Sequence, residues 1–149
     1  MAEHSPIRTK EFLIEITGIK RWVADHFVRH HVGVTPFMST QREDRIQYDC
    51  PRDELGQGTL VNLSMVVNAQ ALINMSRKRL CFQASPETRV VMIEIKREIE
   101  KIDHALAHKM VTECVYRGFC PEIKCCGYCK TDEAKEWRQD YIENRQKIE

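Results

Sequence analysis

Residues 60–80 read LVNLSMVVNAQALINMSRKRL, and this uninterrupted stretch decides the prediction of the fold. It contains neither proline nor glycine, the residues that most often interrupt a helix. Its apolar side chains fit the buried face of an amphipathic helix and stand at Leu63, Val66, Val67, Leu72, Ile73 and Met75. The stretch therefore predicts one long helix over residues 60–80.

The residues before this stretch predict a strand, a helix and a long loop. Glu11–Thr17 combines β-branched and aromatic residues with a glycine just beyond it, which favours a strand. Apolar residues at helical spacing between Lys20 and His31 predict an amphipathic helix, which Thr35-Pro36 would end. The polar stretch Ser39–Gln57 predicts a loop, and long loops in compact domains often have functional roles.

The residues after the stretch predict two further helices and a cysteine-rich segment. Ser85 suits an N-cap and Pro86 the first helical position, so a helix is expected from there to about Met110. A cysteine-rich segment covers residues 114–129, and a polar helix begins at about Asp132. The whole pattern predicts an α+β (mixed α/β) fold, with a small sheet flanked by long helices, in a single domain over residues 1–149.

Composition excludes several classes of protein. Hydrophobic residues make up 42% of the 149 residues and charged residues 30%, so the chain can bury a core. A net charge of +1 gives no general attraction to a nucleic acid polymer or a membrane surface. No apolar run approaches the roughly 18 residues of a membrane span, and residues 1–10 lack the apolar core of a signal peptide. We therefore expect a cytoplasmic protein whose seven cysteines are free thiols or metal ligands.

A basic helix end followed by a polar loop forms the first candidate site. Arg29-His30-His31 ends the predicted helix, and the loop adds Thr35, Ser39, Thr40, Gln41, Arg42 and Arg45. The planar donors of arginine suit phosphate, and hydroxyls and amides can complete an anion or nucleotide site. The same pattern also fits a solvated helix end whose cations complement the helix dipole.

Amides and cations on the predicted long helix form the second candidate site. Gln70, Asn74 and Lys78 stand four residues apart and share one face, while Asn68 and Arg79, eleven residues apart, share another. Amides within an apolar helix need hydrogen-bond partners. These residues therefore fit either a ligand site or a hydrogen-bond network between helices.

Four cations close together form the third candidate, at Arg77, Lys78, Arg79 and Arg89. They span a junction between two predicted helices and together could clamp a phosphate. A solvated charged face is the alternative explanation of the same run.

Five of the seven cysteines are Cys114, Cys120, Cys125, Cys126 and Cys129. Cys126-Gly-Tyr-Cys129 has the spacing of a zinc knuckle, which Cys114 and Cys120 would complete as a structural site, although packed free thiols explain the pattern as well. A redox Cys-x-x-Cys motif is not favoured, because no βαβ pattern surrounds it. His104 and His108 lack the acidic neighbour of a metalloprotease motif and are predicted on a helix surface.

Several segments resemble the flavin-dependent thymidylate synthases, the ThyX family. Asp25–His31 (DHFVRHH) looks like the family's Arg-His-Arg segment, and Val67–Leu80 (VNAQALINMSRKRL) is the second strong match. Ala84–Arg89 (ASPETR) stands in the place of the family's Ala-Gln-x-Glu-Ile-Arg, and Arg52 falls where the family has a phosphate-binding arginine. The resemblance runs from about Phe12 to Cys126.

The resemblance implies a homotetramer of mixed α/β domains, with FAD held between subunits beside deoxyuridylate. It implies flavin contacts from Arg29, His30, His31, Asn68, Gln70 and Asn74. It implies nucleotide contacts from Ser39, Gln41, Arg52, Lys78 and Arg79, with Arg79 as the catalytic candidate that places positive charge near the uracil carbonyls. The implied reaction converts dUMP to dTMP with methylenetetrahydrofolate as the carbon source and NADPH as the reductant of FAD.

The chain departs from the family pattern at several positions. His31, Gln41 and Gln70 stand where the family has arginines, and Phe37 stands where it has a glutamate. Arg42, Arg45 or Lys78 is able to restore charge from an adjacent position. Three other hypotheses remain: a relative that makes another modification at C5 of deoxyuridylate, a flavin- or nucleotide-binding relative without catalysis, and a small zinc-stabilised nucleic-acid module built on the cysteine segment.

Overall fold

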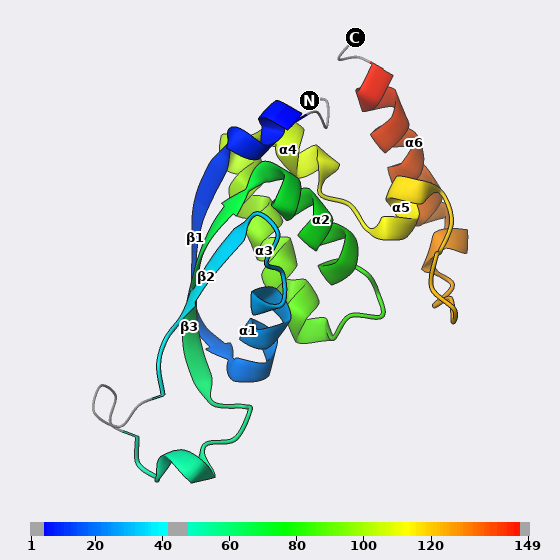
Figure 1. Ribbon diagram of the computed structural model, residues 1–149. Helices are drawn as coiled ribbons and strands as arrows, with labels where there is room; N and C mark the ends of the chain where they lie inside the picture. The colour runs from blue at the N-terminus through cyan, green and yellow to red at the C-terminus, as the bar shows by residue number, and fades with distance from the viewer. Residues whose placement is uncertain (1–4, 42–47, 147–149) are drawn as a thin grey trace.

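The computed structural model describes residues 5–41 and 48–146 (Figure 1). Its strands are β1 (Glu11–Lys20), β2 (Val34–Met38) and β3 (Leu60–Asn68). Its α-helices are α1 (Arg21–Val28), α2 (Ala69–Arg79), α3 (Pro86–Ile102), α4 (His104–Lys109), α5 (Glu113–Arg117) and α6 (Asp132–Gln146). Short 3₁₀ helices are η1 (Ser5–Thr9), η2 (Arg52–Glu54) and η3 (Tyr128–Lys130). The predicted α+β class, the first strand, the first helix and the helix from Asp132 are confirmed.

The predicted helix over residues 60–80 is wrong in its first half, because residues 60–68 form β3. This strand is the centre of a three-stranded antiparallel sheet with the order β1-β3-β2. Alternate side chains of β3 are buried, at Val61, Leu63, Met65 and Val67. That period of two is the period of a strand, and it places Val66 on the other face, where the helical prediction had counted it with the core.

The segment around Thr35-Pro36 is an edge strand, whereas the sequence predicted only a break. Pro36 lies opposite Met65 of β3. An edge strand tolerates proline, because its outer edge has no neighbouring strand that requires a donor. The predicted loop that follows contains η2, while Arg42 and Arg45 lie outside the described residues.

The helices α1, α2 and α3 lie on one side of the sheet, and α5 with α6 lies beyond α2 (Figure 1). The main core between them contains fully buried side chains from every layer, among them Phe27, Leu63, Met65, Met75 and Met92. A second small cluster, of Val111, Val115 and Tyr141, holds α6 against α5. None of the helices within the described ranges is long and apolar enough to cross a membrane.

The junction between α3 and α4 corrects the prediction of one helix continuing to Met110. The start is as predicted, with Ser85 as the N-cap and Pro86 in the first turn. The helix ends at Ile102, because Asp103 leaves the helical conformation (φ −149°) and its carboxylate accepts a hydrogen bond from the Leu106 N–H at 3.0 Å. Asp103 thereby ends one helix and caps the next.

Replacing Asp103 with alanine is expected to destabilise the fold by about 1–2 kcal/mol, the usual cost of losing an N-cap. The side chain also accepts from Lys10 Nζ at 2.6 Å. Burial alone would raise the pKa of Asp103, but the hydrogen bonds from Lys10 and Leu106 outweigh it and lower the pKa. Its stabilisation is therefore present above the unfolded pKa and is lost as the pH falls through the lower folded pKa.

Urea unfolding of Asp103→Ala and of Glu98→Ala provides the measurement and its control. Glu98 pairs with Lys101 on the exposed face of α3, so its removal should cost less than about 1 kcal/mol. Equal losses in the two variants would show that Asp103 does not hold the helix junction.

Candidate functional site

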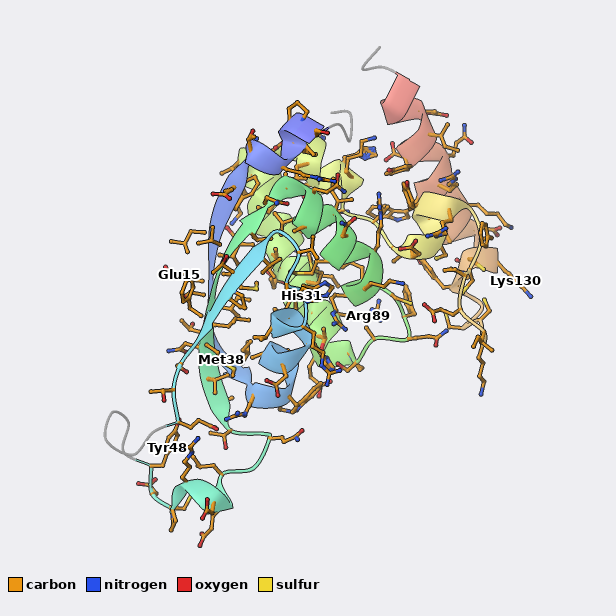
Figure 2. The ribbon with its side chains drawn as sticks, viewed as in Figure 1. Glu15, His31, Met38, Tyr48, Arg89 and Lys130 are labelled. Carbon is orange, nitrogen blue, oxygen red and sulfur yellow. The ribbon has the colours of Figure 1, made fainter. Side chains whose placement is uncertain are left out.

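The side chain of Arg79, at the end of α2, meets the end of α1. Its Nε donates to Nε2 of His30 at 3.0 Å, and its Nη2 donates to the backbone carbonyl of His26 at 2.6 Å. Figure 2 shows the side chains around this junction, with His31 on the turn after α1. Two of the candidate groups from the sequence, which are 49 residues apart in the chain, therefore lie together.

A line of polar contacts continues from this junction to α3. His26 Nδ1 lies 2.8 Å from the hydroxyl of Thr88, and Ser85 Oγ donates to the same hydroxyl at 2.7 Å. Thr88 is fully buried. Sequence reasoning missed His26 and Thr88, although a signal existed: His26 precedes His30 by four residues, which is the helical spacing for side chains on one face.

Positive charge is concentrated at the junction. Burial, and then the charges of Arg79 and His31, lower the pKa of His30 to about 4. Since arginine can only donate, Nε2 of His30 is the unprotonated nitrogen of a neutral ring. Burial and the nearby Arg29 also lower the pKa of Arg79. Arg29 and Arg79 carry like charges that repel each other, and a bound anion would relieve this repulsion.

The remaining residues at this end of the sheet have mixed roles. Arg29 caps α1 and is exposed, and His31 Nδ1 lies 3.2 Å from the Arg29 carbonyl. The sequence predicted Asn68 inside a helix, but it lies just before α2 and caps it, because its side chain accepts a hydrogen bond from the Ala71 N–H at 2.8 Å. Its angular relation to Arg79 on one continuous helix is therefore wrong, and the two residues stand at opposite ends of α2, Asn68 as its N-cap and Arg79 as its last residue.

The predicted common face of Gln70, Asn74 and Lys78 agrees with the course of α2. Gln70 Nε2 donates to Asn74 Oδ1 at 3.3 Å, and Arg77 Nη1 donates to the same oxygen at 3.4 Å. Asn74 and Lys78 are exposed. The amides thus bond within one helix rather than between helices.

Three predicted nucleotide-binding residues, Ser39, Gln41 and Arg52, lie elsewhere. Ser39 Oγ accepts from the Asn62 N–H near the start of β3, six residues before Asn68 at its other end. Six residues of strand span about 20 Å. Arg52 opens η2 in the distant connection between β2 and β3 (Figure 1). The amide nitrogen of Gln41 is buried and has no partner within residues 5–41 and 48–146. The hydrogen bonds of Arg79 go to the end of α1 and not to these three residues.

The four predicted phosphate-clamping cations do not converge. Arg77, Lys78 and Arg79 line a cavity of about 220 Å³ between the end of α2 and the cysteine-rich segment. Arg89 lines a separate cavity, with its guanidinium carbon 3.8 Å from the ring centre of Phe82. The first cavity is also lined by Glu113 and Glu122, and it is smaller than the roughly 300–1,000 Å³ of typical ligand pockets.

The cysteines and histidines give no support to the zinc hypothesis. All seven cysteines are free. Within the part of the chain that the structure describes, no group of three or more His, Cys, Asp or Glu residues is placed to hold a metal ion. His104 is exposed as predicted, whereas His108 is half-buried beside Tyr141, 3.2 Å from the Asp140 carboxylate, so its placement on the helix surface is wrong.

Comparison with family models, with curated proteins and with solved structures finds no match for this chain.

Proposed function

We propose that this chain is a divergent flavin-dependent thymidylate synthase that converts dUMP to dTMP. The supporting observation is the hydrogen bond between Arg79 and His30. These residues belong to the two segments, 67–80 and 25–31, that resemble the family most strongly. Segments that build one site must meet when the chain folds, and this hydrogen bond joins the two.

The charge at the junction fits FAD, whose diphosphate is an anion. The flavin contacts we propose are Arg29, His30, His31, Asn68, Gln70 and Asn74. Bound FAD would supply the hydride, with NADPH as the reductant and methylenetetrahydrofolate as the carbon source. The protein's part is to bind and orient these molecules and to supply positive charge.

Arg79 is proposed as the catalytic residue. Its Nε and Nη2 are held by His30 and by the His26 carbonyl, while Nη1 has no hydrogen-bond partner among the described residues. A neutral His30 accepts the hydrogen bond from Arg79 and adds no positive charge beside it, so the guanidinium stays cationic and oriented. Positive charge fixed near the uracil carbonyls would stabilise the negative charge that develops on the ring.

The separation of Ser39, Gln41 and Arg52 from Arg79 supports a site shared between copies of the chain. Ser39 bonds to Asn62 near the start of β3 and Arg52 lies in the connection between β2 and β3, whereas Arg79 bonds to the end of α1. We propose that the connection between β2 and β3 of one subunit reaches the α1–α2 junction of another in a homotetramer. Lys78, exposed beside Arg79, would add charge toward the nucleotide phosphate.

The visible absorption spectrum, recorded after FAD has been added and the excess removed, tests the proposal. We expect a retained flavin spectrum in the native chain and in Arg97→Ala, and a weaker one in Arg29→Ala. Both arginines are exposed, but Arg97 pairs with Glu94 on α3, away from the junction. A native protein that retains no flavin would contradict the proposal. If the flavin is retained, a reoxidation of the reduced flavin that depends on dUMP tests the reaction.

A second candidate is a flavin- or nucleotide-binding relative that does not catalyse. It is favoured by the uncharged side chains at Phe37, which is 60% exposed, and at Gln41, which is buried. The family has charged residues at both positions. This candidate predicts that FAD and dUMP bind, that no dTMP forms with any reductant, and that the gene does not complement a thymidine auxotroph.

A further inference from the structure

A pair of cysteine thiols lies close together in the segment that the proposed function does not use. Cys125 Sγ and Cys129 Sγ are 3.6 Å apart. The chain reverses between them at Gly127, whose φ of 88° is in the left-handed region that glycine adopts most readily. Cys125 is exposed and Cys129 is half-buried.

We propose that Cys125 and Cys129 form a thiol-modification site that closes into an intramolecular disulfide when a peroxide oxidises it. A disulfide bond is about 2.05 Å long, so the two sulfur atoms need to approach by about 1.5 Å. Rotation of the two side chains about their χ1 angles produces movements of this size. The inference is independent of the proposed function.

The contacts assign different roles to the two sulfur atoms. The Gly127 N–H donates to Cys125 Sγ at 3.3 Å, which stabilises a thiolate there. This hydrogen bond, together with the neighbouring thiols of Cys129 and Cys120, lowers the pKa of Cys125. The contact with Cys125 raises the pKa of Cys129. The more exposed Cys125 is therefore the first nucleophile, and Cys129 the resolving thiol.

The reaction balances with one molecule of hydrogen peroxide. The Cys125 thiolate attacks one peroxide oxygen, the O–O bond breaks, and hydroxide leaves, so that Cys125 becomes a sulfenic acid. The thiolate of Cys129, whose proton has passed to that hydroxide to give water, then attacks the Cys125 sulfur. The S–S bond forms as the S–O bond breaks, and the departing hydroxide takes up the proton that Cys125 first released to solvent. Each sulfur is oxidised by one electron, and the two peroxide oxygens are reduced to water.

The pairing differs from the one suggested by sequence spacing. Cys126 and Cys129 have the Cys-x-x-Cys spacing, yet the sulfur that lies in contact with Cys129 is that of Cys125. Cys126 is exposed, as Cys125 is, and is its immediate neighbour in the chain. It therefore provides a matched control for exposure and position.

The test treats the reduced full-length chain with equimolar hydrogen peroxide, blocks the remaining thiols with iodoacetamide, and maps the peptides by mass spectrometry. We expect a disulfide between Cys125 and Cys129 in the native chain and in Cys126→Ser. We expect Cys125→Ser to lose it, and Cys129→Ser to accumulate a sulfenic acid on Cys125 that dimedone traps. Circular dichroism checks that each variant remains folded, which matters most for Cys129→Ser because Cys129 is half-buried while Cys125 and Cys126 are exposed.

Three results would overturn the proposal. The first is a disulfide that joins Cys129 to Cys126 or Cys120 in the native chain. The second is loss of the Cys125–Cys129 bond in Cys126→Ser. The third is resistance to peroxide together with about one zinc ion per purified chain, because a bound metal would hold the thiolates and protect them.

Discussion

Replacing Gly33 with alanine should destabilise the fold by about 2–4 kcal/mol. Gly33 has a φ of 72°, and a non-glycine residue in this conformation costs of order 1 kcal/mol or more. A Cβ atom at this position would lie 2.4 Å from Nδ2 of Asn68. The Asn68 side chain would have to move, and the N-cap that it provides to α2 would be lost at a further cost of about 1 kcal/mol.

Gly18→Ala is the matched control for this prediction. Gly18 has a similar φ of 66°, but a Cβ atom there would have no neighbour within 4 Å. Its replacement should therefore cost only the backbone term, about 1 kcal/mol, in urea unfolding. In an Asn68→Ala background, Gly33→Ala should cost no more than Gly18→Ala, because the side chain that causes the clash is absent. Equal losses for the two glycines in the native background would show that Asn68 does not pack on Gly33.

The start of α3 could be predicted from the sequence, because its signals are local. Ser85 and Pro86 define the first turn without help from distant residues, because the Ser85 side chain accepts a hydrogen bond from the Thr88 N–H of the same helix. The boundary between β3 and α2 had a much weaker local signal. Leu63, Met65 and Leu72 are all compatible with a helix, and pairing with β1 and β2 determines which residues become strand. Asn68 is the one local cue, as a capping residue within an apolar run.

The candidate site was predictable to the same limited extent. The bond between Gln70 and Asn74 follows from helical spacing alone. The contact between Arg79 and His30 depends on how α1 packs beside α2, which no local pattern reveals. Ser39 and Gln41 could be predicted to lie on a loop, but their distance from Arg79 depends on the register of β2 against β3. The resemblance grouped Ser39 and Gln41 with Arg79, whose hydrogen bonds go instead to His30 and His26.

The largest effect on ligand binding is expected for Arg79→Ala. Loss of a charged hydrogen bond costs about 1.5–3 kcal/mol, so we expect dUMP to bind about 10- to 100-fold more weakly in calorimetry. Arg97→Ala, which removes an exposed arginine of α3, should leave the affinity unchanged.

Arg79→Ala should also raise the pKa of His30 above its value of about 4, measured by NMR titration, because the charge of Arg79 helps to lower it. Burial, the larger cause, would keep it below 6.5.

This pKa also determines how stability depends on pH. The unfolded chain protonates His30 near pH 6.5 and the folded chain near 4, so between these values the unfolded state holds more protons. Stability should therefore fall as the pH is lowered from 6.5 to 4, and fall less steeply in Arg79→Ala, as measured by the urea midpoint. An unchanged His30 pKa in Arg79→Ala would contradict the contact between Arg79 and His30. A raised His30 pKa with unchanged dUMP affinity would retain the contact and reject the proposed role of Arg79 in nucleotide binding.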